Sequence, residues 1–330
     1  MNASRRETLM RLFAGAAIAL LAACAADVAA AQTYPDKPIK MIVPFPPGGP
    51  IDTMARLVAH DLSFNLGQQV VVDNRPGAGS TLGTKAAAAA DPDGYTLLFG
   101  SSGSLAVAPA LYSSFDLDPR KAFAPIASVS LLPHALVVAP SVPARTVAEF
   151  IAYAKANPGK LNYGAGLGTP PHLLSTLFKT EAGIDIVYVP YKGSAASLTD
   201  LLAGQTQMTI DGLTGLYPLI RDGKVRPLAV ARPVRWPELP DVPTMVESGF
   251  PDFVIDAWTG VVAPAGTPPD IVAKLNGAIN EGLKSAETKA NLARFSAIAK
   301  IGSPEEFAAF LAKDMPRWAE IVKLAGAKID

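Results

Sequence analysis

The chain has 330 residues, enough for two domains, and 49% of them are hydrophobic. It carries 29 basic and 29 acidic residues, which excludes the strong basic excess of a nucleic-acid-binding surface. Cys24 is its single cysteine, so no intrachain disulfide can form and the core must stabilise the fold without one.

The first 31 residues have the pattern of a secretory signal peptide. A positively charged start precedes the apolar run Leu12–Ala23, which is shorter than the roughly 20 apolar residues of a membrane span. Small residues at Ala29 and Ala31 predict cleavage before Gln32 and delivery to the periplasm. Cleavage removes three arginines and two acids, so the net charge would change from 0 to −1.

Two other interpretations of this segment stay open. The pair Arg5 and Arg6 resembles a twin-arginine export signal, although Thr8 stands where a large apolar residue is expected. The stretch "LAAC" resembles a lipoprotein box, in which case Cys24 would carry a lipid anchor.

After the signal, short apolar runs alternate with helical patterns in a βαβαβ order. Such alternation is typical of a parallel sheet with helices on both faces. The predicted strands cover residues 39–45, 69–74 and 95–100, and the predicted helices cover 51–66 and 86–90. In such sheets ligands bind at the carboxyl ends of the strands.

The same alternation recurs and predicts a second α/β unit. Its strands are expected at residues 126–130, 134–140, 161–166, 186–191, 207–212 and 225–231, and its helices at 146–157, 169–183 and 193–205. A proline-rich connection follows at 232–244. Residues 268–325 are predicted to be almost entirely helical.

Two such units cannot readily share one core, so we expect two domains. The non-helical runs 128–140 and 254–266 are interpreted as two crossings between the domains. This predicts a discontinuous first domain, residues 32–132 plus 256–330, and a continuous second domain, residues 133–255. Two crossing strands would act as a hinge beside a cleft.

Four glycine-rich turns follow predicted strands, at residues 44–50, 74–83, 100–104 and 163–172. Where such a turn leads into a helix, free N–H groups and the helix dipole favour an anion. Glycine and proline are also ordinary turn residues. Because two of these turns lead into helices of different predicted domains, the pattern favours an anion-binding cleft.

Enzyme signatures are weak. The stretch "GAGSTLGTK" lacks the glycine spacing and the Lys-Ser or Lys-Thr pair of a phosphate-binding loop. His60, His134 and His172 show no metal-ligand spacing, so neither a metal nor a cofactor is expected. Ser102 lacks a nucleophile-elbow motif, and of the three histidines His172 alone is placed to act as a base.

Five motifs carry a family resemblance. They are "YPDKPIKMIVPFPPGGPIDTMAR", "VVVDNRPGAGSTLGT", "DGYTLLFGSSGSLAVAPALY", "LNYGAGLGTPPHL" and "VPYKGSAASLTDLLAGQ". From about Tyr34 to the C-terminus, the chain closely resembles the tripartite tricarboxylate transporter receptors, the TctC-like or Bug extracytoplasmic solute-binding proteins.

The resemblance implies a two-domain α/β periplasmic binding protein of the Venus flytrap, type II-like kind, with each sheet flanked by helices. It implies a receptor without enzymatic activity that captures a small carboxylate, such as a di- or tricarboxylate, an amino acid or an aromatic acid. The receptor would deliver this ligand to the membrane permease subunits of a tripartite tricarboxylate transporter. We expect it to be a monomer.

The resemblance also implies a pincer, in which the first and fourth glycine turns hold one ligand carboxylate. Backbone amides, small hydroxyls and water would make the contacts. The corresponding residues here are Pro47, Gly48 and Gly49 on one side and Gly166, Gly168 and Thr169 on the other. Further candidates are Ser101 and Ser104 as neutral donors, and Tyr191, Lys192 and Gly193 of a Tyr-Lys-Gly motif.

Three charged candidates each keep two interpretations. Asp52 caps the first helix or meets a ligand amine, and Lys192 pairs with a distal carboxylate or faces solvent. Asp211 either enters the cleft at a strand end or starts a turn. His172 is included among the ligand-binding candidates.

Two substitutions leave the ligand open. Ala165 and Leu167 stand where relatives often carry small polar residues. Phe45, Tyr163 and Leu167 are expected to form an apolar wall, compatible with an aromatic acid or a short dicarboxylate. Alternative functions are an exported α/β hydrolase or lyase that uses His172, and a sensory protein that presents its ligand to a signalling partner.

Overall fold

The computed structural model describes residues 34–329. Everything described below lies in the compact unit that begins at Pro38. Across residues 34–329, no helix is both long and apolar enough to cross a membrane. The predicted signal segment, with Gln32 and Cys24, lies outside the described residues.

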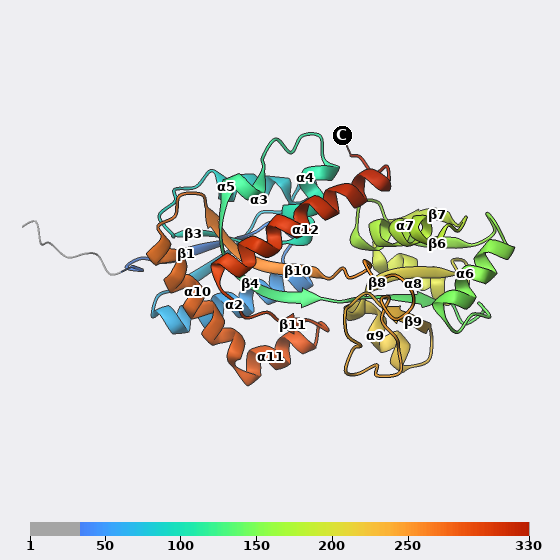
Figure 1. Ribbon diagram of the computed structural model, residues 1–330. Coiled ribbons are helices and arrows are strands. Elements are labelled where there is room, and N and C mark those ends of the chain that lie inside the picture. Colours follow the sequence, from blue (N-terminus) through green and yellow to red (C-terminus); the bar gives the residue numbers. More distant parts are fainter. Residues whose placement is uncertain (1–33, 330) are drawn as a thin grey trace, which may run out of the picture. The chain divides into compact units, whose positions relative to one another are not determined.

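The first of two sheets has six strands in the order β11-β4-β10-β3-β1-β2 (Figure 1). Its parallel part is β1 (Ile39–Val43), β2 (Val70–Asn74) and β3 (Thr96–Ser101). An antiparallel extension adds β10 (Ala257–Pro264), β4 (Phe123–Leu132) and β11 (Ile298–Ala299). β1 and β3 are almost wholly buried, as expected for strands covered on both faces.

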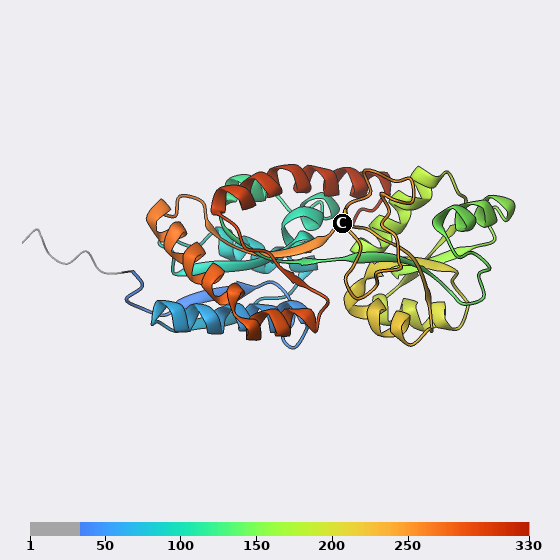
Figure 2. The same cartoon turned by 60° about the horizontal axis from the view of Figure 1, so that its bottom comes forward.

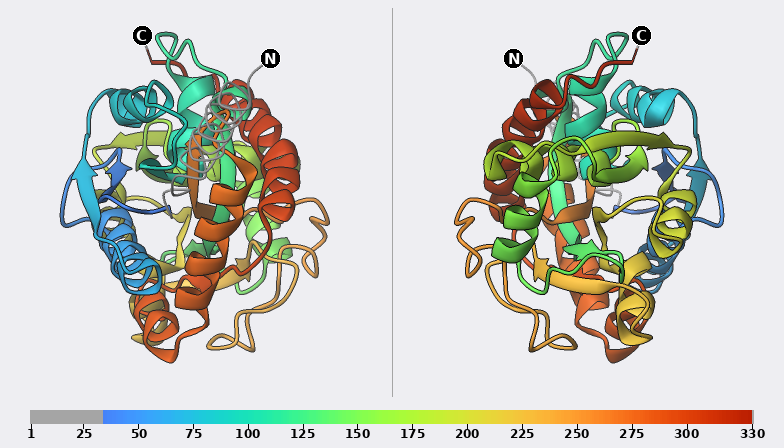
Figure 3. Two further views of the ribbon diagram at one scale, coloured as in Figure 1. Left: turned by 90° about the vertical axis from the view of Figure 1, so that its left-hand side faces the viewer. Right: turned by 90° about the vertical axis from the view of Figure 1, so that its right-hand side faces the viewer.

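Helices surround this sheet. They are α2 (Pro50–Leu66), α3 (Thr81–Ala88), α4 (Ala108–Leu111), α5 (Pro119–Ala122), α10 (Pro269–Lys284), α11 (Ala286–Ala293) and α12 (Pro304–Leu324), with the short turns η1 (Ala78–Ser80) and η2 (Gly103–Val107). α2 packs against α10, and the end-on views show helices on both sides of the strands (Figure 3).

The second sheet has five strands in the order β7-β6-β8-β5-β9. β6 (Asn162–Gly166) pairs in parallel with β7 (Val187–Tyr191) and β8 (Met208–Gly212). β5 (His134–Val138) runs antiparallel to β8 and β9 (Arg226–Val230). The helices beside it are α6 (Val147–Ala156), α7 (Pro170–Ala182), α8 (Ser194–Leu202) and α9 (Leu213–Arg221).

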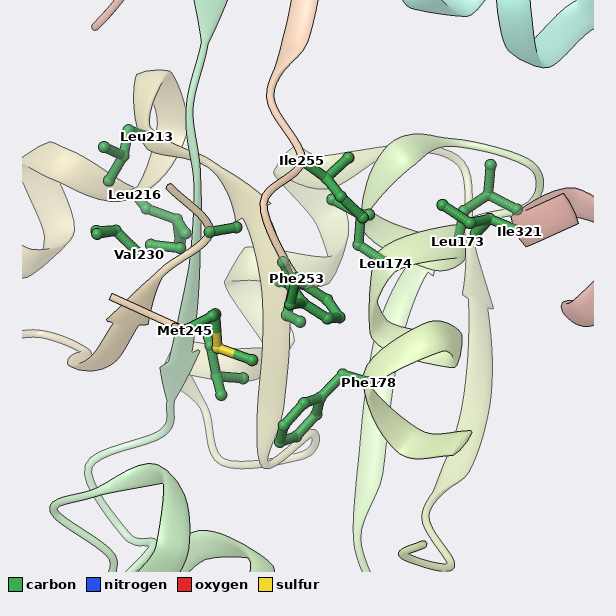
Figure 4. Close-up of a cluster of buried hydrophobic side chains, with 14 of the residues drawn as sticks. Leu173, Leu174, Phe178, Leu213, Leu216, Val230, Met245, Phe253, Ile255 and Ile321 are labelled. Atoms are coloured by element: carbon green, nitrogen blue, oxygen red, sulfur yellow. The ribbon is translucent and has the colours of Figure 1, made fainter. Parts of the chain in front are cut away.

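Aliphatic and aromatic side chains together fill the core of this second lobe (Figure 4). Phe178 of α7 meets Phe253 edge to face, with ring centroids 6.4 Å apart. Ile321 of α12 reaches this region and lies beside Leu173 of α7. The second core therefore includes a side chain from a helix that starts beside the first sheet.

Two stretches of chain connect the lobes. β4 continues almost directly into β5, and residues 252–256 lead back into β10 (Figures 1 and 2). α12 adds a third link, because Nη1 of Arg317 donates to the carbonyl of Val254 at 2.6 Å. The predicted α/β class and its two flanked sheets are confirmed.

Some elements were not predicted. α9 contains Gly215 and Pro218, which weaken a helical pattern, and η2 with α4 starts inside a Gly/Ser-rich turn. β11 interrupts the predicted C-terminal helices because Ile298 and Ala299 pair with the edge of β4. These misses share a cause: tertiary packing overrides local preference.

Candidate functional site

A cavity of about 380 Å³ lies between turns of the two lobes. The first lobe contributes the turns after β1 and β2 and the segment from η2 through α4. The second lobe contributes the turn from β6 into α7. The described lining residues are Pro44, Phe45, Pro46, Pro76, Gly77, Gly79, Ser80, Gly103, Val107, Ala108, Leu111, Tyr112, Leu167, Gly168, Thr169 and Pro170. The cavity therefore lies at carboxyl ends of parallel strands, where ligands of α/β proteins bind.

The turn between β1 and α2 is held by a buried carboxylate. Gly48 has φ +83°, and its N–H donates to Oδ2 of Asp52 at 2.8 Å. Arg56 Nε donates to the same oxygen at 3.0 Å, and Asn74 Nδ2 donates to Oδ1 at 2.8 Å. Burial raises the pKa of Asp52, but these hydrogen bonds outweigh it and hold the pKa below its ordinary value. Both carboxylate oxygens of Asp52 therefore accept hydrogen bonds from the protein itself, and Asp52 fixes the shape of the turn.

The turn between β6 and α7 has the same geometry with a neutral anchor. Gly168 has φ +70°, and its N–H donates to Nδ1 of His172, four residues on, at 3.3 Å. The His172 ring packs on Tyr188 with centroids 4.2 Å apart. Burial lowers the pKa of His172, and an accepting Nδ1 places the proton of the neutral ring on Nε2.

These bonds decide which amides can meet an anion. The amides of both positive-φ glycines are bonded inside their turns, and the Thr169 N–H donates to Gly166 O at 3.1 Å. The expectation that these amides are bare is therefore wrong for this structure. The N–H groups of Gly49 and Ile51 at the start of α2 make no hydrogen bond to any described residue. α7 begins with two prolines, which have no N–H to offer.

A third turn, between β2 and α3, brings a left-handed segment to the cavity. Ala78, Gly79 and Ser80 have φ values of +43°, +59° and +78°. Two non-glycine residues in this region cost about 1–3 kcal/mol each, so surrounding contacts must stabilise the turn. The Tyr112 ring makes one such contact. It packs so closely on Gly79 that a Cβ added to this glycine would lie 2.2 Å from the ring.

Tyr112 also offers a polar group. Its hydroxyl makes no hydrogen bond with the described part of the chain, and the residue lines the cavity half-buried. The N–H of Gly79 likewise makes no hydrogen bond to residues 34–329. Backbone N–H groups in such turns form concave anion sites. Tyr112 and Gly79 therefore provide neutral donors at the wall.

Ser101 and Ser104 bond to each other. The N–H of Ser101 donates to Oγ of Ser104 at 2.9 Å, and the N–H of Ser104 donates to Oγ of Ser101 at 3.3 Å. Both residues are buried, and Oγ of Ser104 also donates to the Ser101 carbonyl at 3.2 Å. The two hydroxyls fix the start of η2, and the structure does not bring them to the cavity.

The Tyr-Lys-Gly motif ends β7 and starts α8 outside the cavity wall. The Tyr191 hydroxyl donates to Oδ2 of Asp200 at 2.6 Å, and burial together with this bond raises the pKa of Tyr191 to about 12. Lys192 is exposed and forms no ion pair within residues 34–329. Gly193 precedes the first residue of α8. Lys192 thus matches the solvent-facing interpretation.

Asp211 is the last residue but one of β8. Its side chain is buried, Oδ1 accepts the Gly212 N–H at 2.7 Å, and Oδ2 has no partner among the described residues. Burial raises the pKa of Asp211 to about 6, although its hydrogen bond from the Gly212 amide lowers it. Both interpretations of Asp211 stay open. Its Oδ1 closes the turn after β8, and its unbonded Oδ2 leaves one oxygen for a group in the cleft.

Three of the predicted site residues line the cavity: Phe45, Gly168 and Thr169. Leu167, expected in the apolar wall, lines it too. Tyr163 does not, because its ring is buried in the second core and its hydroxyl bonds Thr176 at 2.8 Å. The other candidates, Pro47, Gly48, Gly49, Asp52, Ser101, Ser104, Gly166, His172, Tyr191, Lys192, Gly193 and Asp211, lie outside the described lining.

Sequence reasoning missed the wall formed by Val107, Leu111 and Tyr112. These residues follow the third glycine turn, so the turn was a usable signal, but it pointed to its serines. A Cβ on Gly168 would lie 2.3 Å from Cδ2 of Leu111. The two lobes therefore touch at this glycine.

A larger hollow of about 600 Å³ lies on the first lobe, between residues 105–120 and α12. Its charged side chains are already paired: Arg120 Nε lies 3.0 Å from Asp118 Oδ1, and Lys85 reaches Asp116. It takes no residue from the second lobe. We therefore assign the candidate site to the smaller cavity.

Catalytic and metal chemistry find little support. No group of three or more His, Cys, Asp or Glu within residues 34–329 could hold a metal ion. Nδ1 of His172, the base of the hydrolase alternative, already accepts the Gly168 amide. The geometry instead offers neutral donors and apolar surface.

A family model described as "Tripartite tricarboxylate transporter family receptor" matches residues 54–327. The chain is 41% identical to Protein BugT of Bordetella pertussis over 97% of this chain and 99% of that one. Members of this family are substrate-binding receptors, not enzymes.

Solved structures agree with this match. The structure titled "R. palustris Rpa4515 with adipate" is 38% identical, has a TM-score of 0.75 and covers 90% of this chain and all of that one. MatC from Rhodopseudomonas palustris, with bound malate, is 34% identical with a TM-score of 0.71, covering 88% and 100%.

Proposed function

Because the chain belongs to the tripartite tricarboxylate transporter receptor family, we propose that it captures one small carboxylate between its lobes and delivers it to the permease subunits of such a transporter. The observation that carries the proposal is the cavity whose wall combines Phe45 of the first lobe with Gly168 and Thr169 of the second. Relatives solved with adipate and malate support a carboxylate as the ligand.

Neutral donors would hold the carboxylate. Tyr112 and Gly79 line the cavity, and their hydroxyl and amide would be the first donors. The amides of Gly49 and Ile51, unbonded among the described residues, lie at the start of α2 just beyond the lining and would join them when the lobes close. A hydrogen bond to a charged group contributes about 1.5–3 kcal/mol, so two such bonds suffice for micromolar binding when apolar contacts add to them.

The lobes would act as two domains, residues 32–132 plus 256–330 and residues 133–255, hinged where the chain crosses. Ligand contacts on both sides would favour the closed arrangement. Small-angle scattering should show a smaller radius of gyration when ligand saturates the protein. An unchanged radius would overturn the hinge and leave the receptor function standing.

Export completes the proposal. We propose that residues 1–31 are removed and that the receptor, beginning at Gln32, works as a monomer in the periplasm. Intact-mass measurement of the periplasmic protein tests this. A mass that fits a lipid-modified chain from Cys24 to Asp330 would contradict it.

Ligand capture itself is tested in two steps. Native mass spectrometry of the purified protein should show an adduct in the mass range of small organic acids, which is lost on denaturation. A thermal-shift panel of mono-, di- and tricarboxylates, each beside its amide, should then show stabilisation by acids and not by amides. Stabilisation by no carboxylate at millimolar concentration would overturn the receptor function.

A further inference from the structure

The segment that carries Leu111 and Tyr112 is too short to hold its own shape. η2 is a single π-helical turn and α4 has four residues, far fewer than a helix needs to be stable alone in water. Leu111 and Tyr112 end this segment and line the cavity, where their side chains approach Gly168 and Gly79. Contacts from other parts of the chain must therefore hold this part of the wall.

The C-terminal tail, residues 325–329, supplies one such contact. Ile329 and Tyr112 form a parallel β-bridge. The Ile329 N–H donates to the Leu111 carbonyl at 2.8 Å, and the Ile329 carbonyl accepts the Ser113 N–H at 3.3 Å. The last carbonyls of a helix have no partner within the helix, so Ile329 satisfies one that α4 leaves open. The tail thus bonds the chain on both sides of Tyr112.

The tail is itself fixed to the end of α12. Gly326 has φ +58°, and its N–H donates to the Lys323 carbonyl at 3.1 Å. The N–H of Ala327, which is buried, donates to the Val322 carbonyl at 3.2 Å. These two bonds form a Schellman motif, in which a left-handed glycine ends the helix and turns the chain. The motif sets the direction in which the tail leaves α12.

α12 contacts elements on both sides of the cavity. It packs against η2 and α4 of the first lobe and against α7 of the second, and Figure 1 shows it running from the first sheet towards α7. Its side chains reach the second lobe where Arg317 bonds the Val254 carbonyl and Ile321 lies beside Leu173 (Figure 4). The tail therefore extends from a helix that is already fixed to both lobes.

We infer that the C-terminal tail is a positioning element of the ligand site, and that Ile329 holds Leu111 and Tyr112 in their ligand-binding positions. The inference rests on the proposed function, because it requires Tyr112 to meet the carboxylate. Without the bridge, α4 would lose its partner at the point where it reaches the cavity. A donor that must be ordered during binding costs affinity, whereas a donor that is already in place does not.

Calorimetric titration of Ile329→Pro tests this role. Proline lacks the N–H that bonds Leu111, whereas Ile329→Val, the matched control, keeps that N–H beside a side chain of similar size. The probe is the acid of the carboxylate panel that stabilises the unchanged protein most; the panel includes adipate and malate, with which two relatives were solved. Affinity should fall at least about tenfold in Ile329→Pro and stay within about threefold in Ile329→Val.

A double-mutant cycle separates positioning from a general loss of stability. Tyr112→Phe removes one hydrogen bond to a charged group and should weaken binding at least about tenfold. Because Ile329 acts by placing that hydroxyl, Ile329→Pro should weaken binding less than about threefold once Tyr112 is phenylalanine. A tail that only stabilised the fold would weaken binding by the same factor in both backgrounds.

Hydrogen exchange of the ligand-free protein tests the wall separately. A chain that ends at Lys328 lacks Ile329, so the Ser113 amide loses its acceptor and the Leu111 carbonyl its donor. Peptides that cover residues 108–115 should then exchange at least about tenfold faster. Peptides from the buried strand β1 are the control and should exchange as in the full chain.

The outcomes separate the two proposals. Equal affinities of Ile329→Pro and Ile329→Val would overturn the positioning role and leave the receptor function intact. Equal factors in the two backgrounds, or unchanged exchange at residues 108–115, would do the same. Failure of every carboxylate to bind the unchanged protein would overturn the receptor function, and the positioning role with it.

Discussion

The turns that start α2 and α7 use one backbone device with different anchors. In each, a glycine at positive φ precedes a helix that begins with proline, and its N–H donates to the side chain four residues later. The anchor is the carboxylate of Asp52 in the first turn and the neutral imidazole of His172 in the second. The device fixes the turn in both, so the glycines shape the backbone and do not themselves supply free amides.

The surroundings of the two turns differ more than their geometry. Gly48 is exposed and has open space beside it, whereas Gly168 lines the cavity and contacts Leu111 of the other lobe. The first turn is therefore built for rigidity and the second for contact across the cavity. Variants of the two glycines and their anchors separate these two properties.

The largest effect is expected at Gly168. Gly168→Val places a side chain against Leu111 at positive φ, so affinity for the best acid of the panel should fall at least about 100-fold. Gly183→Val is the matched control, since Gly183 has φ +59° at the other end of α7 with nothing within 4 Å. Calorimetric titration should show that the control binds normally. An equal loss of ligand affinity in both variants would mean that backbone strain at positive φ causes it, and not the contact between residue 168 and Leu111.

A second prediction compares the anchors. Asp52→Ala removes three hydrogen bonds to a buried carboxylate and should lower the free energy of unfolding by about 2–4 kcal/mol. His172→Ala removes one neutral hydrogen bond and a ring contact and should cost about 1–2 kcal/mol. Urea unfolding measures both, and the reverse order would contradict the assignment of the stronger anchor to the first turn.

The anchors should also respond to different pH ranges. Since burial lowers the pKa of His172 from 6.5, the unfolded chain binds the proton more readily, and this contribution to stability is lost as the pH falls below about 6.5. The pKa of Asp52 is held below 3.8, so its contribution persists until the pH falls below about 4.

Urea unfolding of the protein and of His172→Asn between pH 8 and 5 tests this. Asparagine keeps an acceptor near Nδ1 but does not titrate. The stability difference between the two proteins should therefore shrink as the pH falls. A difference independent of pH would show that His172 is not held neutral.

The smallest effect is expected at Gly48. Gly48→Ala should cost about 1–2 kcal/mol of stability, because an alanine at φ +83° is strained, while no atom obstructs its Cβ. Ligand affinity should stay within about threefold of the unchanged protein, since Gly48 does not line the cavity. A loss of affinity as large as that of Gly168→Val would show that the first glycine meets the ligand.

The fold was largely predictable because its strands and helices have clear apolar periods. The paired turns were visible as well: "GGPID" and "GTPPH" place glycine, proline and an acceptor at the same spacing. The sequence did not reveal that Asp52 and His172 accept the N–H groups of Gly48 and Gly168. The wall from Val107 to Tyr112 was missed because its helix starts in a glycine and serine turn, and its role depends on contact with the other lobe.

The most direct test of the central claim is a titration of the best acid of the panel against its own primary amide. Because neutral donors inside the cavity would hold the carboxylate, the acid should bind with micromolar affinity and the amide at least about 100-fold more weakly. Equal affinities for acid and amide would contradict it, because the cavity would then recognise the apolar body without the anion.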